Sequence, residues 1–379
     1  MNTVTMDSHR VPAGPHPSPA QAAEPADAAG IDPRGRLVVR SHEEVRRIAA
    51  DTETYSSHVS RFLQVPNGLD GEEHRRVRAL LDPLFSPAEM ERLRPVLERV
   101  AADLVSELTP GARLCAVEDL GSVYAVRAQC AWLGWDPGIE GELLEWMRDN
   151  HEATRSGELA RTAEVASRFE GIVRRQIRAA RQSIAPTVTA RLLGLRSGDG
   201  RGLKEAEVVS ILRNVTGGDL GSLALCAGVL CQWLAERPEQ QDAWRSLDDG
   251  ALDAAIDEVL RIDDPFTFNR RAATCPVEVA GHRLEAGDQV VLDWTSANRD
   301  PGVFKDPDAF EPERNAASNL VYGVGPHVCP GRPLATLELR VLLRALLERF
   351  ALAPGPEAPV REQWPLGGWQ TVPLALSAR

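Results

Sequence analysis

The sequence of 379 residues predicts a mainly α-helical, α+β domain, and three observations support this fold class. Apolar residues recur at helical spacing in long runs between residues 72 and 262. Short alternating segments typical of strands occur near the two ends of the ordered chain, and no internal repeat is found. Length alone would suggest two or three domains, but this distribution indicates a single domain over residues 36–379.

The composition excludes several classes of protein. Lys and Arg number 43 and Asp and Glu 55, so the net charge of −12 argues against a nucleic-acid-binding protein. No apolar run approaches the roughly 20 residues of a membrane span, and no basic-then-apolar signal peptide is found. The six cysteines form no CxxC pair, which fits a reduced, cytoplasmic setting.

The first part of the chain is expected to change from disorder to helix. Residues 1–35 are rich in proline and alanine and poor in large apolar residues, so they predict a disordered tail. Residues 35–40 read as a short strand, and Ser41 with Glu44 forms a capping box that begins a helix. Further helices are expected over 72–81, 87–108, 117–133, 141–155 and 158–183.

The segment 204–236 predicts the longest helix of the chain. It contains no internal proline, and at 1.5 Å per residue it would span about 50 Å. Its second half is apolar on nearly every face, which is typical of a buried helix. We therefore expect it to run through the middle of the protein.

The remaining third mixes strands, loops and one long helix. A helix over 252–262 ends before Pro265, and residues 265–295 alternate in the manner of short strands. Residues 298–330 are rich in loop formers. A helix over 332–350 and a hairpin that turns near Gly367 complete the chain.

The stretch from Tyr322 to Gly331, of sequence YGVGPHVCPG, sets Cys329 apart from the other cysteines. Cys329 lies directly before the final helix, where the helix dipole and unpaired N–H groups favour a thiolate. Gly323 and Gly325 allow the backbone to approach a bulky group closely. A thiolate placed in this way is a good ligand for a metal with one axial position to fill.

This stretch, followed by Leu334 and Ala335, resembles the haem-thiolate loop of the cytochrome P-450 superfamily. The resemblance covers about residues 36–379 and implies that family's single-domain fold, with the long helix crossing the haem. It implies haem b (iron protoporphyrin IX) as cofactor, Cys329 as iron ligand and His327 as a partner of a haem propionate. Gly323 and Gly331 belong to the same cofactor-binding loop. Tyr322 is a mild departure, because the family usually has Phe there.

Other marks of the family gain meaning from their positions. Glu258 and Arg261 match its ExxR pair, and Arg314 would supply the second arginine of its buried, structural Glu-Arg-Arg cluster. The resemblance further implies that His74 and Arg78, four residues apart on one helix face, bind the haem propionates. Arg271, just after the ExxR helix, is expected to do the same.

The distal helix departs from the family pattern, Ala-Gly-x-Glu/Asp-Thr. Here the stretch is TGGDLGS, in which Asp219 fits the acid and Leu220 falls at the position of the alcohol. Two explanations stay open. Protons reach the site through Thr216, Ser222, water or a substrate hydroxyl. Alternatively, the reaction is atypical: oxidative cross-linking or coupling, desaturation or peroxygenation.

The substrate site and the partners follow from the resemblance. We expect Phe266, Thr267, Asn269, Gly218 and Trp369 to contact a small-molecule or short peptide-like substrate. The chain has no flavin or dinucleotide fingerprint, so electrons are expected from a separate ferredoxin and ferredoxin reductase. Neither a membrane nor a nucleic acid is expected as partner, and the protein is expected to be a monomer. The helix and strand that family members have before residue 35 are expected to be missing.

The leading functional hypothesis is a bacterial monooxygenase that oxidises a small or medium-sized organic substrate in secondary metabolism. The atypical reactions named above are the alternative within enzymes. A non-catalytic, haem-bearing module that recruits a substrate carrier is the third hypothesis. Cys329, His327 and Asp219 argue against that module, because a scaffold would not require them.

Overall fold

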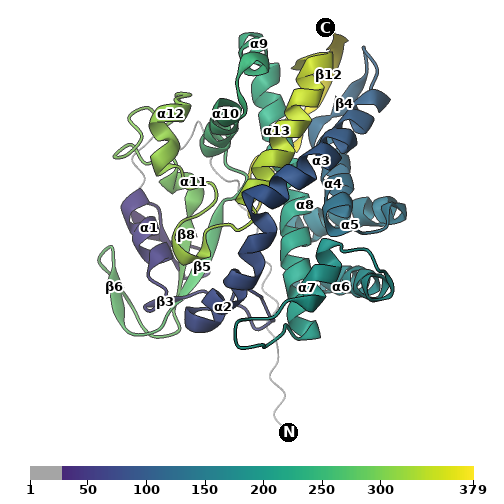
Figure 1. Cartoon of the computed structure of the whole chain (residues 1–379). Coiled ribbons are helices and arrows are strands. Elements are labelled where there is room, and N and C mark those ends of the chain that lie inside the picture. The colour runs from purple at the N-terminus through teal and green to yellow at the C-terminus, as the bar shows by residue number, and fades with distance from the viewer. Residues whose placement is uncertain (1–27) are drawn as a thin grey trace.

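Helix α8 (Glu205–Ala235) runs through the middle of the protein, as its apolar composition predicts (Figure 1). The computed structural model describes residues 28–379. From Leu223 onward nearly every side chain of α8 is buried. Among the described helices, α8 alone has the length and composition to span a membrane, but most of it is buried inside the protein. It is therefore the core helix around which the others pack.

The predicted helices form, with ends that agree to within about three residues. They are α1 (His42–Ala50), α2 (Gly71–Leu81), α3 (Pro87–Glu107), α4 (Val123–Leu133), α5 (Glu140–Ser156), α6 (Leu159–Gln182), α10 (Asp249–Ile262) and α13 (Arg332–Arg349). The helix predicted over 117–133 begins as a π-helical segment, Ala116–Ser122, before it continues as α4.

Several short helices escape the sequence pattern. Helix α7 (Val188–Gly194) has seven residues, too few to establish a period, although Thr187 caps it. Helix α9 (Pro238–Ser246) begins three residues after the end of α8. Single helical turns, α11 (Trp294–Ala297) and α12 (Pro312–Asn315), lie in and beside the segment predicted as loops. Helices of one or two turns are fixed by their packing more than by periodicity.

A five-stranded sheet packs beside the helices in the order β1-β2-β8-β5-β3. Its strands are β1 (Ala29–Ile31), β2 (Leu37–Val39), β3 (Tyr55–Ser56), β5 (Phe268–Ala273) and β8 (Gln289–Asp293). Strands β2 and β8 pair in parallel, and the other pairs are antiparallel. In this sheet the first described residues of the chain lie beside the segment that follows α10.

The N-terminal prediction needs a correction. Residues Ala29–Ile31, predicted as part of a disordered tail, form β1 and pair with Leu37–Val39. A strand therefore precedes Gly35, contrary to the expected absence of that part of the fold. The rest of the predicted tail, residues 1–27, lies outside the described residues.

Smaller sheets complete the fold. Strands β4 (Arg113–Cys115), β12 (Pro373–Ala378) and β9 (Phe350–Pro354) form a three-stranded sheet. Strands β6 (Val277–Val279) and β7 (His282–Leu284) form one hairpin. The hairpin predicted near Gly367 joins β10 (Val360–Arg361) to β11 (Trp369–Thr371).

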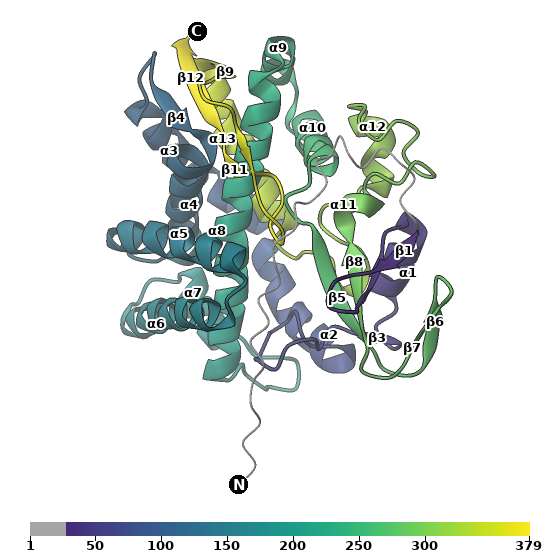
Figure 2. The same ribbon diagram turned by 180° about the vertical axis from the view of Figure 1, so that it is seen from behind.

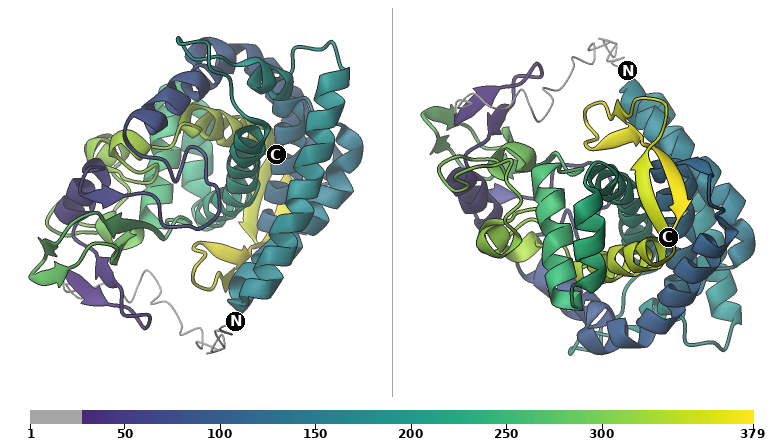
Figure 3. Two further views of the ribbon diagram at one scale, coloured as in Figure 1. Left: turned by 90° about the horizontal axis from the view of Figure 1, so that it is seen from below. Right: turned by 90° about the horizontal axis from the view of Figure 1, so that it is seen from above.

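The elements divide into two sides. The five-stranded sheet, α1 and the β6–β7 hairpin lie on one side, and helices α4 to α7 lie on the other (Figures 1 and 2). Views along the perpendicular direction show the same separation, with α8 between the two sides (Figure 3). The loop before α13 and the end of α2 meet α8 between these sides, and this is where the functional residues gather.

Candidate active site

A cavity of about 540 Å³ lies between α8, the loop before α13 and the start of β5. Its wall draws on chain segments from Pro66 to Leu366. Several helices and the sheet side therefore contribute to one site. Many of the residues predicted for the site line this cavity. The other predicted residues do not line it. The cavity wall holds Gly218, Asp219, Ser222, Phe266, Thr267, Asn269, Arg271, Gly323, His327, Cys329 and Gly331.

The loop from Tyr322 to Gly331 is held rigidly. The backbone N–H of Cys329 donates to the carbonyl of Tyr322 at 2.9 Å, which closes the loop on itself. Gly325 has a φ of +77°, and a Cβ there would lie 2.9 Å from the Cα of Ala50 at the end of α1. Only glycine satisfies both the positive φ and this close approach. The packing of the loop against α1 thus places Cys329.

The Cys329 thiol faces the cavity at the N-terminus of α13. Burial raises its pKa, and the N–H groups of Gly331 and Arg332, which lower it, do not fully offset burial. The N–H groups at the start of α13 thus favour the thiolate, as the sequence predicts, and burial opposes them. A bound metal cation is the further influence that deprotonates such a thiol.

Two histidine rings are in contact beside the cavity. The rings of His74 and His327 have centroids 4.0 Å apart. The Nε2 atom of His327 lies 3.0 Å from the Ser57 hydroxyl and 3.3 Å from an Asp70 carboxylate oxygen. Burial and the neighbouring His74 and Arg271 lower the pKa of His327 to about 4. Asp70 is thus the carboxylate that the His327 side chain contacts at the edge of the cavity.

Two buried nitrogen atoms next to the cavity lack partners among the described residues: Nε2 of His74 and Nε of Arg271. His74 is 4% exposed and Arg271 is 6% exposed. Burial lowers the pKa of both groups, because each would carry an unpaired positive charge. A ligand with carboxylate groups in the cavity would satisfy these atoms and the charge together.

Arg78 lies against the cysteine loop, and its contact with a haem propionate stays a prediction. Its guanidinium donates to the carbonyls of Pro326 and Val328 at 3.1 and 2.9 Å and pairs with Asp82 at 2.7 Å. It does not line the cavity. Arg78 therefore braces the cysteine loop from outside the cavity wall.

The cavity-facing side of α8 corrects the reading of the distal stretch. Gly218, Asp219 and Ser222 line the cavity, whereas Leu220 is fully buried in the apolar core. Thr216 is also fully buried, and its hydroxyl has no partner among the described residues. The hydroxyl on the cavity side is that of Ser222, which donates to the Gly218 carbonyl.

Asp219 joins the cavity to the core. Burial raises its pKa to about 7, and the one hydrogen bond that it accepts comes from the Gln129 amide on α4. A carboxyl that titrates near neutrality is suited to donate and accept protons. Asp219 and Ser222 are three residues apart on one face of α8, so both groups reach the same cavity.

The predicted substrate residues are only partly brought together. Thr267 donates to the Pro365 carbonyl at 2.8 Å, and the Asn269 side-chain oxygen accepts from Trp294 at 2.8 Å. Both lie in the wall with Phe266. Trp369 does not line the cavity. The guanidinium carbon of Arg361 lies over its ring, 3.5 Å from the ring centroid.

The structural cluster around Glu258 has a different third member from the one expected. Glu258 and Arg261 are 1% and 0% exposed and form a bidentate pair at 2.8 and 2.9 Å. Arg314 does not join them; it pairs with Glu311 at the surface. The Asn315 amide takes that place and donates to Glu258 at 2.7 Å.

The sequence reasoning missed Ser57, Asp70 and Gln129. Each acts through a contact with a distant residue, such as Ser57 with His327, which lie 270 positions apart. Asp70 precedes α2 as its N-cap residue, but nothing in the local pattern connects it to the cysteine loop. No local signal would have found these residues.

Comparisons with known proteins agree with this geometry. The sequence model of the family described as Cytochrome P450 matches residues 250–376. Cyclomarin C epoxidase CymV from Salinispora arenicola is 30% identical over 337 residues, which cover 84% of this chain and 84% of that protein. The 6-deoxyerythronolide B hydroxylase from Saccharopolyspora erythraea is 31% identical over 296 residues, covering 76% of this chain and 71% of that protein.

A solved structure is similar over almost the whole chain. The mutant of P450 EryK in complex with erythromycin B matches with a TM-score of 0.82 at 26% sequence identity. The match covers 93% of this chain and 94% of that one. The similarity therefore includes the cavity as well as the segment that the family's sequence model matches.

Proposed function

The chain belongs to the cytochrome P450 family, whose members are monooxygenases with a haem cofactor, and we propose that it inserts oxygen into a small or medium-sized organic molecule of bacterial secondary metabolism. The relatives described above support this proposal, since one is named an epoxidase and another a hydroxylase. The single observation that carries it is the Cys329 thiol at the cavity wall, beside buried nitrogen atoms of His74 and Arg271 that have no partner among the described residues.

The residues present fit haem b, iron protoporphyrin IX. Cys329 would provide the iron ligand, with Gly323 and Gly331 leaving room in the same loop. His74, His327 and Arg271 would hold the two propionate groups, whose oxygens would pair with the unpartnered nitrogen atoms of His74 and Arg271. Arg78 would act indirectly, by bracing the loop carbonyls. The bound haem supplies the dioxygen and one-electron chemistry that no side chain provides.

Asp219 and Ser222 are proposed to deliver protons to the cavity. Asp219 holds or releases a proton near neutral pH, and Ser222 presents a hydroxyl four residues beyond Gly218 on the same face. Thr216 is left out of this route, because its hydroxyl is buried away from the cavity. The atypical reactions rested on Leu220 at the alcohol position. Since Leu220 lies in the core, we retain the standard monooxygenase reaction as the proposal.

The substrate is proposed to lie against the wall formed by Phe266, Thr267, Asn269 and Gly218. No atom lies within 4 Å of the position that a Cβ of Gly218 would take, so Gly218 leaves space in the cavity for a substrate. Phe266 offers an apolar surface, while the hydrogen bonds of Thr267 and Asn269 hold the wall in shape. A substrate that is mostly apolar suits these surroundings.

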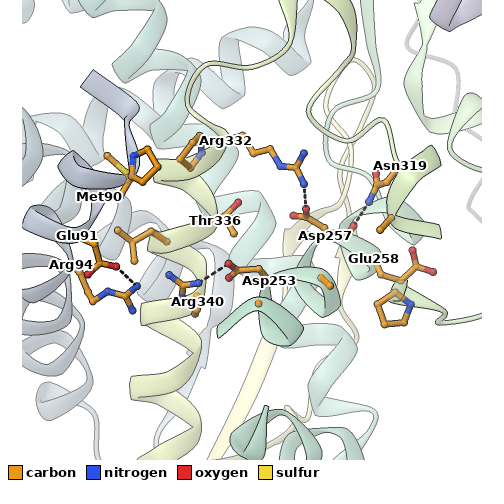
Figure 4. A pocket seen from close by; sticks show the side chains of 17 residues that line it. Met90, Glu91, Arg94, Asp253, Asp257, Glu258, Asn319, Arg332, Thr336 and Arg340 are labelled. Carbon is orange, nitrogen blue, oxygen red and sulfur yellow. Dashed lines mark hydrogen bonds and ion pairs between the residues drawn. The ribbon is translucent and has the colours of Figure 1, made fainter. Parts of the chain in front are cut away.

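The protein is proposed to be a cytoplasmic monomer. Its electrons are proposed to come from a separate ferredoxin, which a ferredoxin reductase reduces. A groove of about 550 Å³ lies on the face of α13 that points away from the cavity (Figure 4). Arg332 and Arg340 project into it and pair with Asp257 and Asp253 at 2.9 and 2.6 Å. Carboxylates of an acidic partner would compete for these arginines at a point close to Cys329.

The proposal is tested by the absorption spectrum of the reduced, CO-bound protein. We expect a far-red-shifted Soret band that is lost in Cys329→Ser and kept in Cys275→Ser, which changes an exposed cysteine elsewhere. A haem-loaded wild type without this shift would overturn the assignment of Cys329 as iron ligand.

A further inference from the structure

The five-stranded sheet packs one face against α1 and turns its other face away from that helix. Successive side chains of a strand point to opposite faces of a sheet. Leu37 of β2 and Ala273 of β5 pack in the core with residues of α1, so they mark the covered face. Arg36, Phe268 and Arg270 have the opposite parity, and they define what we call the outer face of the sheet.

Pairing across β8 brings two arginines of the outer face near each other. Continued by one residue, the register of β2 with β8 sets Arg36 opposite Gln289. Gln289 also lies opposite Ala272, so Arg270 is its diagonal neighbour on the other side. Nη1 of Arg270 donates to the Gln289 side-chain oxygen at 3.4 Å. The two arginine backbones are therefore roughly 10–12 Å apart across two strand spacings, and their long side chains can reach one group between them.

The positive charges of the outer face are only partly balanced by the protein. Arg36 pairs with Asp32 at 2.6 Å. Neither Arg34 nor Arg270 forms an ion pair with a described residue, and the described residues accept from one of the five donors of Arg270. Burial and the charges of Arg36 and Arg34 lower the pKa of Arg270. An anion bound here would relieve the repulsion that Arg270 experiences from both neighbours.

An aromatic pair connects the outer face to the cavity. The rings of Phe268 and Trp364 stack with their centroids 5.4 Å apart and an interplanar angle of 13°. Trp364 lies between β10 and β11, in the turn that reaches β5 (Figure 2). The guanidinium carbon of Arg34 is 6.0 Å from the centroid of the Trp364 ring, and Phe268 lines the cavity. Arg270 is two residues beyond Phe268, about 7 Å along the same strand. The arginines therefore begin where the cavity wall ends.

We propose that Arg34 and Arg270, with Arg36 beside them, bind the anionic group of an elongated substrate. The apolar part of this substrate lies in the cavity and passes over the stacked rings of Phe268 and Trp364. Its carboxylate or phosphate accepts hydrogen bonds from the guanidinium groups, which match such oxygens in geometry and charge. Because the site serves the same cavity, its role in substrate selection rests on the proposed function.

Binding to the holoenzyme, measured by isothermal titration calorimetry, tests the anion site. The probes are N-decanoylglycine, its uncharged amide and decyl phosphate. We expect the acid to bind about tenfold more tightly than the amide, because only the acid is ionised. A tighter complex with decyl phosphate than with the acid would assign the site to a phosphate ester, and a weaker one would assign it to a carboxylic acid. Equal binding of the acid and the amide, or no binding of any probe, would overturn the proposal.

Two substitutions locate the preference for the acid. Arg270→Gln and Arg34→Gln should each lower the affinity for the acid about threefold and leave the affinity for the amide unchanged. Arg113→Gln is the matched control, because Arg113 is an exposed arginine on β4, which belongs to another sheet. If both variants keep the wild-type preference, the arginines of the outer face do not bind the anion and the proposal is wrong.

The spectrum of the reduced, CO-bound protein separates this site from the proposed function. Both arginine variants should keep the far-red-shifted Soret band, because their side chains lie outside the cysteine loop. If the acid is preferred but the wild type lacks this band, the anion site stands and the proposed function fails. If the band is present and the preference is absent, the anion site alone is wrong.

Discussion

Glu258 shows how a single buried carboxylate organises the loops beneath the cavity. It accepts two hydrogen bonds from Arg261, one from the backbone of Glu311 and one from Asn315. The remaining donors of Arg261 reach the carbonyls of Asn298 and Pro307. The pair is therefore fully satisfied although it is almost completely buried, which is the condition under which a buried ion pair is tolerated.

We expect Arg261→Ala to lower the free energy of unfolding by about 3–5 kcal/mol, since it leaves Glu258 buried without its charge partner. Arg314→Ala, which removes an exposed arginine, should change it by less than about 0.5 kcal/mol. Urea unfolding followed by tryptophan fluorescence measures both. A large loss in Arg314→Ala would show that this arginine supports the cluster after all.

Among single residues, local spacing in the sequence was enough to predict those that lie in a recognisable motif. Cys329, His327 and Arg271 lie in the cavity wall as the loop motif and the position after the ExxR helix indicated. Spacing within α8 was not sufficient to predict which of Leu220 and Ser222 faces the cavity. In the structure Ser222 lines the cavity, whereas Leu220 is buried in the core.

Among the contacts between elements, the one between α1 and the cysteine loop leaves no room for a larger side chain at Gly325. Gly325 approaches the last turn of α1 so closely that its Cβ position is 3.0 Å from the Ala49 carbonyl oxygen. The backbone of the loop is thereby pressed against a helix whose own buried residues pack on the sheet. The position of Cys329 thus depends on an element almost 280 residues earlier in the chain.

Gly325→Ala is expected to lower the melting temperature and to reduce the haem retained per protein chain. Alanine there carries both the strain of a positive φ and a clash with α1. Gly281→Ala is the matched control, since its φ of +78° is nearly the same but nothing lies within 4 Å of the new methyl group. We expect a cost of about 1 kcal/mol for the control and about 2–4 kcal/mol for Gly325→Ala. Equal effects of the two substitutions would contradict the role of the α1 contact.

Long periodic elements were predictable and short ones were not, for a physical reason. Helices α3 and α6 bury one face over many turns, so their periodicity appears in the sequence, and α8 appears there as a long apolar run without proline. Strand β1 has three residues and exists through its pairing with β2. Its sequence, Ala-Gly-Ile, carries no alternation of its own, and tertiary pairing therefore overrides the composition of its surroundings.

An ion pair between distant segments of the chain connects the two parts of the molecule near the cavity. Arg155 at the end of α5 pairs at 3.0 Å with Glu362, which directly follows β10 in the β10–β11 hairpin, and the Glu362 side chain is 1% exposed. Burial raises the pKa of Glu362, and Arg155 opposes that change. This pair ties the helical side of the protein to the C-terminal strands beside the cavity.

Arg155→Met should therefore destabilise the protein by about 2–4 kcal/mol, because it leaves the buried Glu362 carboxyl without its charge partner. The double variant Arg155→Met/Glu362→Gln should recover most of that loss. Arg161→Met, which removes a partner of the exposed Glu152, should have little effect. Thermal unfolding of the three variants measures these differences, and a double variant no more stable than Arg155→Met would refute the pairing argument.

The paired arginines on the outer face of α13 have a consequence for how quickly an electron donor arrives. Arg332, Arg340 and Arg344 already hold aspartates of α10, so their charge is largely cancelled a few ångströms from the surface. A field cancelled at short range does not steer a diffusing protein from a distance. The association rate with an acidic donor should thus depend only weakly on ionic strength, and the selection among donors should occur at contact, where the aspartates must be displaced.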